Sequence, residues 1–515
     1  MIMIHKIFSK HIEKGASLML LVCIASLSPV IASSADFYVD SSAATGGNGS
    51  QASPFATIPA ALAAASANST IWVRGGEGRA YGVTNSTDTL QIPPGMDGLS
   101  ICAYETTPGD GGRADVILSD TYIGSDTYVA DKARFHIISN AANFVTVSGL
   151  AFSFGPNSVG KQYSKVNNGK DVVVGCSVFR NDGAFATLEN CVFRMSKPTG
   201  FGGSGSTAAA PLVWCKTTDA TNLVVRGCEF YNTRCWSVGH GYAPIQCMSN
   251  AQIVDNVFSN VNSVVVPEQH DWRQPSVNVF SENILIASNI VYGANEHDVS
   301  ANYPGILRGV YAGPSSVEIA YNRFIFDRNA RAQNGNALRH RIWMSFGGQY
   351  GSPVSWGDAT LIHHNTFVGG TIAFLLKNNS ARRTRIYDNL IFLDEGGTNL
   401  VENASSFPSG QTTAFVSPSC IQANAWLSDA FNGGTATQVS GYDLSPFLVD
   451  NIALVAPLEF VCTNDIYNAD FYRVRCRQGD PNLKRLGWRG PDDLQPRFIG
   501  ALEPIVPGSF TIYLR

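Results

Sequence analysis

Histidines are concentrated in the middle of the sequence, where each of four lies shortly before a short apolar segment. The four are His240, His270, His297 and His340. The whole chain has only nine histidines. An imidazole gains or loses a proton near neutral pH without help from its surroundings, so this set predicts proton transfer.

Two of these histidines share a local pattern of acidic neighbours. The patterns are Glu268-Gln-His270-Asp271 and Glu296-His297-Asp298. Carboxylates and imidazoles also bind metal ions, so a metal site is an alternative use of the same residues. The sequence does not indicate which metal it would be.

Cationic and aromatic side chains gather around the same histidines. They are Arg273, Arg308, Arg331, Arg339 and Arg341, and Trp272, Tyr303 and Trp343. Guanidinium groups pair well with carboxylates, and aromatic rings offer flat apolar faces to sugar rings. The mixture predicts a site for an acidic polysaccharide, with His240 and the two acidic patterns among its binding residues.

β-Elimination across a uronic acid is the reaction that fits these residues best. The proton at C5 of the sugar becomes acidic once the neighbouring carboxylate is neutralised by Arg, by Ca²⁺ or by amide groups. In this hypothesis His270 or His297 is the base, Arg308 or Arg339 meets the carboxylate, and His340 is the acid. Ca²⁺ is therefore a candidate cofactor.

A repeated phrase organises the elements that must position these side chains. Apolar segments, most of them containing Asn, end at Phe193, Phe230, Phe258, Val291, Phe324, Phe367 and Ile391. A repeat of roughly 20 to 50 residues is typical of solenoids and propellers. A second apolar segment precedes the phrase, at 135–138, 211–214, 244–247, 277–280, 305–308, 341–344 and 371–374. One rung is predicted as strand, turn, strand and a longer return loop.

Stacked rungs would place equivalent residues about 4.8 Å apart. The Asn residues of the phrase can then hydrogen-bond from rung to rung, while the Phe, Ile and Val column fills the interior. These residues are Asn190, Asn256, Asn289, Asn322, Asn365 and Asn389, and we predict a structural role for them. Strand alternation sends one of His363 and His364 inward and the other outward. These two and His136 are left out of the site, which is expected in the long return loops.

The two ends of the chain carry a resemblance to a known family. Asp36–Asp40 and Ile71–Arg74 are predicted strands, separated by a Gly-rich loop, Ser53-Pro-Phe-Ala-Thr57 and an Ala-rich helix from about Ile58 to Ala67. With the ending Ile499–Glu503, they resemble secreted right-handed parallel β-helix proteins, the pectate-lyase-like superfamily. The resemblance implies an all-β solenoid with an N-terminal cap at 36–80. Because members of this superfamily also use Lys or Arg as the base, it adds Lys377 as a reserve candidate.

The first 35 residues are predicted to be an export signal. Lys6, Lys10 and Lys14 precede an apolar run over 16–31 and small residues over 32–35. The run is short for a membrane span. We therefore expect a secreted or periplasmic protein with no stable membrane anchor after cleavage.

The cysteines allow disulfides in an exported protein. Cys191 and Cys228 hold the same place in consecutive repeats, so they can bond or merely stack, and stacking is preferred. Cys462 and Cys476 bracket a late loop and are predicted to form a staple.

Composition and rhythm complete the interpretation. A net charge of −4 gives no reason to expect nucleic acid, and 49 glycines suit a large, turn-rich extracellular monomer. The clearest coils are expected over about 130–395, with irregular final coils and a C-terminal cap over 396–515. The sequence is interpreted as a polysaccharide-degrading enzyme, with a uronic-acid lyase preferred.

Two alternatives stay open. One is a glycoside hydrolase on the same fold, with paired carboxylates drawn from Glu268, Asp271, Glu296 and Asp298. The other is a non-catalytic adhesion protein whose solenoid presents a binding face.

Overall fold

The computed structural model describes the following parts of the chain, which we call the described residues: 34–83, 89–118, 136–154, 163–167, 170–174, 177–194, 212–215, 217–231, 244–259, 263–266, 268–269, 279–280, 282–292, 305–307, 315–325, 342–345, 360–369, 372–377, 384–392, 399–403, 420–422, 425–427, 438–439, 442–443, 448–449, 452–454, 458–477, 483 and 498–505. The predicted export signal therefore lies outside them and stays a prediction. No helix among them is long and apolar enough to cross a membrane.

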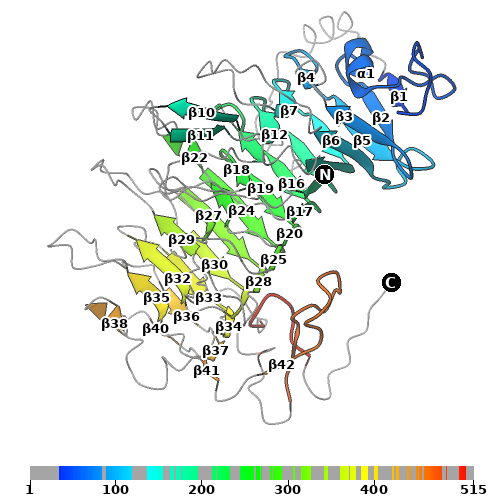
Figure 1. Ribbon diagram of the computed structural model, residues 1–515. Coiled ribbons are helices and arrows are strands. Elements are labelled where there is room, and N and C mark those ends of the chain that lie inside the picture. Colours follow the sequence, from blue (N-terminus) through cyan, green and yellow to red (C-terminus); the bar gives the residue numbers. More distant parts are fainter. Residues whose placement is uncertain are drawn as a thin grey trace, which may run out of the picture. The chain divides into compact units, whose positions relative to one another are not determined.

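Parallel sheets run the length of the described part of residues 35–515 (Figure 1). Sheet A has 13 described strands: β1 (Asp36–Val39), β2 (Thr70–Arg74), β5 (Ser100–Tyr104), β8 (Thr146–Ser148), β13 (Thr187–Glu189), β16 (Val224–Arg226), β19 (Gln252–Val254), β24 (Glu282–Ala287), β27 (Ser315–Ala320), β30 (Thr360–His363), β33 (Thr384–Tyr387), β36 (Cys420–Gln422) and β40 (Leu448–Val449). Sheet B has 12 described strands: β3 (Ala80–Val83), β6 (Ala114–Leu118), β9 (Leu150–Phe154), β14 (Val192–Arg194), β17 (Glu229–Tyr231), β20 (Val257–Ser259), β25 (Ile290–Tyr292), β28 (Arg323–Ile325), β31 (Thr366–Val368), β34 (Leu390–Phe392), β37 (Ala425–Leu427) and β41 (Ile452–Ala453).

A third face is built from two further parallel sheets. The strands of sheet C that the structure describes are β4 (Leu90–Ile92), β7 (His136–Asn140), β12 (Ser177–Asn181), β15 (Val213–Cys215), β18 (Ile245–Gln246), β21 (Ser263–Val266) and β26 (Gly305–Leu307). Those of sheet D are β29 (Ile342–Ser345), β32 (Ile372–Lys377) and β35 (Asn399–Asn403). Strand β26 contacts β29, so sheet D continues the face of sheet C.

Each rung takes one strand from each face in a fixed order. The chain passes from sheet C or D to sheet A, through a tight corner to sheet B, and then by the return loop to the next rung. The connection to sheet A is a short turn in most rungs, but it is 15, 14 and 16 residues long after β21, β29 and β35. The chain is a parallel β-helix, which confirms the expected fold. The rung nevertheless has three strands, because the Asn phrase is not one strand but two, with the corner between sheets A and B in its middle.

Antiparallel pairs stand outside this stack. Among the described residues they are β10 (Tyr163–Asn167) with β11 (Lys170–Val174), β22 (Glu268–Gln269) with β23 (Val279–Phe280), β38 (Gln438–Val439) with β39 (Tyr442–Asp443), and β42 (Glu459–Phe460) with β43 (Val474–Arg475). The predicted strand at 277–280 is therefore a hairpin strand. The strand that belongs to sheet C in that rung is β21, which the sequence pattern did not indicate.

The interior is filled by residues in register from rung to rung. Phe193, Phe230 and Phe258 are fully buried and stack with ring centroids 4.6 and 4.7 Å apart. Strand spacing of about 4.8 Å matches this separation, so the same register pairs the strands and stacks the rings. The predicted interior column of Phe, Ile and Val is confirmed.

A ladder of buried asparagines runs along the corner between sheets A and B. Its described members are Asn256, Asn289, Asn322, Asn365 and Asn389. Each Nδ2 donates to the Oδ1 of the next Asn over 2.9 to 3.0 Å, and each backbone N–H donates to the same oxygen. The second Nδ2 proton reaches a carbonyl of the preceding rung, as from Asn322 to Ile286 at 2.8 Å. The predicted ladder is confirmed for these five residues.

Asn190 does not belong to this ladder, contrary to the sequence interpretation. It is exposed and has a φ of 54°, like Asp255, Ser288 and Asp388 at the same corner. The ladder position is two residues before the interior Phe, and in this rung Cys191 holds it. Asn suits both positions, because its side chain can hydrogen-bond in the ladder and its backbone tolerates positive φ at the corner. The sequence pattern therefore placed Asn190 one residue away from the true ladder position.

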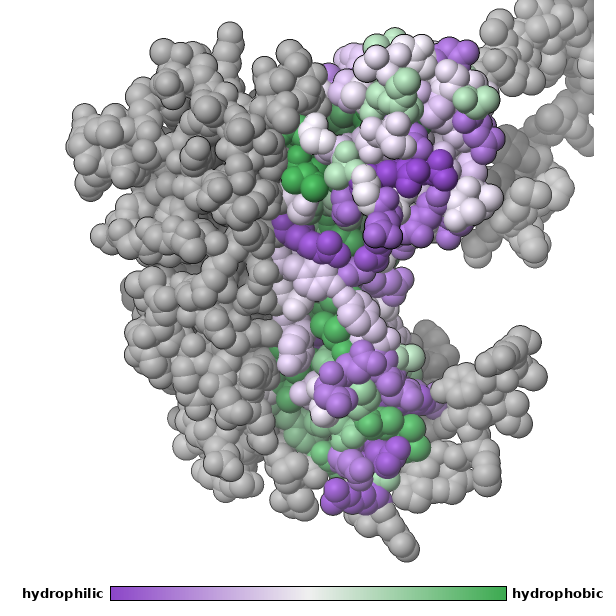
Figure 2. Space-filling model, turned by 45° about the vertical axis from the view of Figure 1, so that its right-hand side comes forward, coloured by the Kyte–Doolittle hydropathy of each residue, from purple (hydrophilic) through white to green (hydrophobic). Residues whose placement is uncertain are grey.

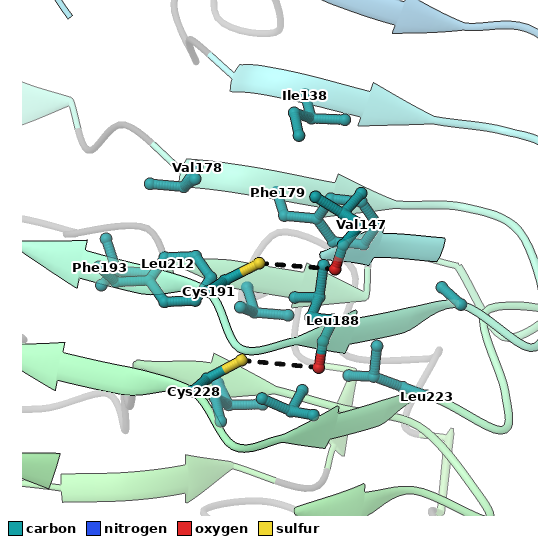
Figure 3. Packing of buried hydrophobic residues seen from close by; sticks show 14 of the residues in the cluster. Ile138, Val147, Val178, Phe179, Leu188, Cys191, Phe193, Leu212, Leu223 and Cys228 are labelled. Atoms are coloured by element: carbon teal, nitrogen blue, oxygen red, sulfur yellow. Dashed lines mark hydrogen bonds between the residues drawn. The ribbon is translucent and has the colours of Figure 1, made fainter. Parts of the chain in front are cut away.

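Thiols continue the ladder where the asparagines end (Figure 3). The Sγ of Cys191 donates to the carbonyl of Val147, and that of Cys228 donates to the carbonyl of Leu188, each over 3.5 Å. These carbonyls correspond to the ones that the asparagines use one rung away. The two cysteines are free and buried, so stacking, the preferred prediction, is confirmed. Cys462 and Cys476 are not joined by a disulfide, so the predicted staple is wrong.

The N-terminal end of the stack is closed by a helix. Helix α1 (Ile58–Ala64) begins after Thr57, whose side chain accepts from the N–H of Ala60, and it ends at Ala65, where the backbone turns extended. Ile58, Ala61 and Leu62 are buried in the main core. The helix is three residues shorter than predicted, and it contacts β1, β2 and β4.

The end of the chain folds back onto sheet B instead of only adding coils. We call residues 458–477 and 498–505 the C-terminal segment; it runs beside the later strands of sheet B in Figure 1. Phe471, Val474 and Ile499 form a second core with outer-face residues of sheet B such as Ile325 and Leu390. Arg323 donates to the carbonyl of Phe471 over 2.8 Å, and burial lowers the pKa of Arg323.

Replacing Asn322 by Ala should lower the free energy of unfolding by about 4 kcal/mol, because it leaves buried hydrogen-bonding groups on both neighbouring rungs without a partner. Denaturant unfolding would measure the loss. Gln252→Ala, at an exposed position on strand β19 of sheet A, should change stability by less than about 0.5 kcal/mol. Equal effects of the two substitutions would contradict a stabilising ladder.

The buried thiols should resist alkylation in the folded protein. Burial raises the pKa of Cys215 to about 12 and the pKa values of Cys228 and Cys247 well above the usual thiol value, so they stay protonated and enclosed. With iodoacetamide at pH 8, we expect Cys462 to be labelled in the native state and these three only after unfolding. Mass spectrometry without reductant also tests the staple, since a disulfide would leave Cys462 and Cys476 unlabelled even when unfolded.

Candidate functional site

The return loops carry most of the predicted site. Each loop runs from the end of a sheet B strand to the next strand of sheet C or D. His270 and its neighbours 271–273 were expected in such a loop, but they follow β21 of sheet C and belong to the connection from β21 to β24 of sheet A. The predicted residues that lie outside the described residues are His240, His270, Asp271, Trp272, Arg273, Glu296, His297, Asp298, Tyr303, Arg308, Arg331, Arg339, His340 and Arg341. Their roles stay predictions. In sequence, Arg308 directly follows β26, and Arg341 directly precedes β29.

Three predicted residues lie in described strands, and two of them are brought together. Glu268 is in β22, which pairs with β23 outside the coil stack. Trp343 is in β29 and Lys377 is in β32, and these strands are neighbours in sheet D. Trp343 is in register with Leu375, and Lys377 is in register with Ser345, so Trp343 and Lys377 lie two positions apart on one face of the sheet.

The outer face of sheet C carries polar and aromatic residues that sequence reasoning missed. Phe179 and Asn181 are fully buried, so Arg180 between them points outward. Trp214 lies in register with Arg180 on the next strand, and Gln246 lies in register with Trp214 on the strand after that. The three therefore form a row across β12, β15 and β18. The signal was present in the sequence, because the residues on either side of each are fully buried.

Arg180 is held at the edge of this row by an acidic neighbour. Its Nη2 donates to Asp182 Oδ2 over 2.6 Å. The Nε of Arg180 and the Oδ1 of Asp182 are buried and make no hydrogen bond in the described part of the chain. Leaving such atoms unpaired is costly, so the pair has hydrogen-bonding capacity to offer a ligand. His136 packs beside Trp214, with ring centroids 5.6 Å apart.

Within the described residues, no group of three or more His, Cys, Asp or Glu side chains is placed to hold a metal ion. The two acidic patterns proposed for a metal lie almost wholly outside those residues. Ca²⁺ therefore stays a prediction. The thiols near this face, Cys215 and Cys247, are buried in the interior, and their raised pKa values make them poor nucleophiles.

His363 and His364 form a separate cluster at the corner between sheets A and B. Both are buried, although one was expected to point outward into solvent. Their Nδ1 atoms lie 2.9 Å apart, and the Nε2 of His363 lies 3.1 Å from Glu318 Oε1. Tyr387 stacks on His363, and Phe498 of the C-terminal segment packs against His364, which explains the burial. Both histidines lie away from the face of sheets C and D.

A carboxylate on the outer face of sheet B joins three distant parts of the chain. Glu229 in β17 accepts from Arg113, which precedes β6, from Tyr231 on its own strand, and from Tyr467 of the C-terminal segment. The side chain of Glu229 is 12% exposed. Burial alone would raise the pKa of Glu229, but the hydrogen bonds from Tyr231 and Arg113 and the charge of Arg113 outweigh it, so the pKa is lowered.

Comparisons with known proteins are confined to solved structures, since no model of a protein family matches the sequence and no curated protein matches it. The chain is similar to the pectate lyase Pel9A, with 12% identity, 91% of this chain and 96% of that chain covered, and a TM-score of 0.42. A family PL6 polysaccharide lyase from Pseudopedobacter saltans gives 10% identity, 88% and 97% coverage, and a TM-score of 0.44.

A lacto-N-biosidase of family GH136 from Eubacterium ramulus is also similar. It shares 12% identity, with 82% of this chain and 68% of that chain covered and a TM-score of 0.41. The similarity to these proteins is one of fold alone.

Removing the charge of Glu229 should loosen the C-terminal segment. In Glu229→Gln, amide hydrogens of residues 459–477 are expected to exchange faster, while those of β5 stay unchanged. Because the folded pKa is lowered, the carboxylate contributes stability above its unfolded pKa of about 4.3 and loses that contribution as the pH falls through the folded value. Thermal unfolding between pH 7 and pH 3 should therefore show a steeper loss for the wild type than for Glu229→Gln. Parallel pH profiles would contradict the role of this carboxylate.

Proposed function

We propose that the protein binds an acidic polysaccharide along the face of sheets C and D and cleaves it by β-elimination. The observation that carries this proposal is the register of sheet D, which puts Trp343 and Lys377 on one face of neighbouring strands. That sheet continues sheet C, whose outer face carries Arg180 and Trp214. Trp214 is itself only 9% exposed, so the groups proposed to meet a polymer laid across the strands are Arg180, Trp343 and Lys377.

The reaction needs three groups, and the chain has a candidate for each. A base removes the proton at C5 of a uronic acid, and the electron pair of that bond forms the C4–C5 double bond as the C4–O bond breaks. The departing oxygen takes a proton from an acid, for which His340 is proposed. The base is Lys377, or His297 from a return loop, or His270 from the connection between β21 and β24. Arg308 or Arg339 neutralises the carboxylate, which makes the C5 proton acidic.

A lysine acts as a base only when its pKa is lowered, since the usual value is about 10.4. Like charges and burial both lower it. Arg339 and Arg341 come just before β29, the strand that pairs with the strand of Lys377, and they are proposed to supply the like charge. The histidines need no such help, which is why they remain in the proposal.

The hydrolase alternative needs two carboxylates about 5 to 9.5 Å apart across the scissile bond. Of the four carboxylates considered for it, Glu268 is in the described residues, and its strand pairs outside the coil stack. No observation on the described residues favours hydrolysis over elimination. Export to the periplasm or the medium, and a Ca²⁺ ion that assists the arginines, belong to the same proposal.

The proposal predicts a product that absorbs in the ultraviolet when the protein meets a suitable uronic-acid polymer. Pectate, alginate and glycosaminoglycans should be screened with and without a chelator, and reducing ends should be counted in parallel. Reducing ends without absorbance would show hydrolysis, and neither signal with any polymer would favour the adhesion protein. Loss of the absorbance with chelator would support the metal.

Single replacements should then separate the roles. Ala in place of the true base among Lys377, His270 and His297 should lower kcat about 100-fold or more. Arg180→Gln should mainly raise KM, since it removes a binding contact at the edge of the face. Arg226→Gln, on the outer face of sheet A, is the matched control and should leave both constants unchanged. Full activity in all of the first four variants would show that the site lies elsewhere.

A further inference from the structure

The outer face of sheet B is divided into a covered part and an open part. Over its later strands the C-terminal segment buries Ile325, Val368 and Phe392. Over the earlier strands the same register position holds Ser153, Arg194, Tyr231, Ser259 and Tyr292, on β9, β14, β17, β20 and β25. Arg194 is exposed, and the others are half-buried. We call these five residues the polar row.

The polar row ends at the C-terminal segment, and side chains from two distant parts of the chain reach it. Tyr292 packs against Phe471 of the C-terminal segment, with ring centroids 5.9 Å apart, so the row ends where the covered part begins. Arg113 and Tyr467 reach Glu229, which lies beside Tyr231 in β17. Figure 2 shows the molecule hollowed on this side, between the N-terminal rungs above and the C-terminal segment below. The row spans four strand spacings, or about 19 Å.

Most of the polar groups in the row are not used by the protein. In the described part of the chain, the hydroxyl groups of Ser153, Ser259 and Tyr292 and the guanidinium of Arg194 make no hydrogen bond or ion pair. Tyr231 alone is engaged, through Glu229 and Tyr467. Hydroxyls, phenols and a guanidinium spaced at regular intervals suit a ligand that carries hydroxyl and carboxylate groups along its length.

Arg194 is the charged group through which the row would meet an acidic ligand. Glu229 is already neutralised by Arg113, while Arg194 stands exposed without an acidic partner among the described residues. Asp115, exposed on the outer face of β6, balances one of these cations, so Arg194 is the group of the row that would meet an anionic group of a ligand. Tyr467, which is 63% exposed, adds an aromatic surface beside the row. Aromatic faces next to hydrogen-bonding groups are a common basis of ligand recognition.

We propose that the polar row is a second carbohydrate-binding site, which takes a uronic-acid oligosaccharide through Arg194 and the row's free hydroxyl groups. The identity of the polymer rests on the proposed function, whereas the geometry of the polar row does not depend on it. Since sheet B and sheets C and D are different faces of the coil, the row lies apart from the proposed catalytic face. It would hold the polymer without cutting it and so raise the local concentration of substrate.

The test is calorimetric titration with oligogalacturonate and oligomannuronate as acidic probes and a cello-oligosaccharide as the neutral one. The Lys377→Ala background limits turnover during the titration. We expect one of the acidic probes to bind, and its affinity to fall with added salt. Arg194→Gln should weaken that binding about tenfold, and Tyr292→Phe, which keeps the packing on Phe471, by a smaller factor. Arg226→Gln should bind as before.

Hydrogen exchange locates the binding and separates the two proposals. Protection by the probe of backbone amides in β14, β17 and β20 is expected, whereas protection confined to sheets C and D would overturn the second site. Equal affinity in Arg194→Gln, preference for the neutral probe, or no binding of either acidic probe would overturn it too. Binding that depends on Arg194 in a protein without lyase activity would leave the second site standing and the proposed reaction refuted.

Discussion

Register between successive rungs is the constraint on which this structure depends, and buried amides enforce it. In each of five rungs an Asn side chain lies in the interior, where it hydrogen-bonds to neighbouring rungs. A slip of one residue would leave these groups unpaired and turn the Phe column outward. The ladder therefore does more than stabilise one corner. It fixes which residues face the interior and which face solvent on every sheet that follows.

The corner between sheets A and B requires a strained backbone conformation, and different rungs accommodate it with different residues. The residue before the ladder position has positive φ, which suits Gly227 and Asp255 but not Tyr321 or His364. The two bulky residues stack on each other, with ring centroids 4.9 Å apart, and their backbone N–H groups donate to the next rung. Phe144 and Phe185 do the same at the turn into sheet A, with φ values of 58° and a stacking distance of 4.7 Å. Strained residues thus come in adjacent pairs, where stacking between rungs offsets the strain.

The features of the fold that could be predicted from the sequence are those that repeat along it. The distance from Asn to Phe repeats, so the rungs, the ladder and the interior column were predictable, and the mistake at Asn190 arose because Asn fits two adjacent corner positions. The strand β21 was missed because it follows β20 after only three residues and lacks a turn signal of its own. Arg180 and Trp214 could have been found from alternation within their strands. The packing of the C-terminal segment on sheet B could not have been predicted. The apolar residues that it covers look like ordinary strand residues in the sequence, and nothing there indicates that a distant segment packs on them.

The ladder also explains why chemistry can sit beside such a regular stack. The return loop from sheet B to sheet C has three residues after β20 but eighteen after β14. The sheet C strands that follow these loops are nevertheless in register with their neighbours. Loop closure entropy grows slowly with length, so long return loops cost little once the rungs are pinned at the opposite corner. The face of sheets C and D is therefore the one place where residues can change number and type without disturbing the interior. Sheet B has no such freedom at its later strands, because the C-terminal segment covers them, and only its open polar row is left to meet a ligand.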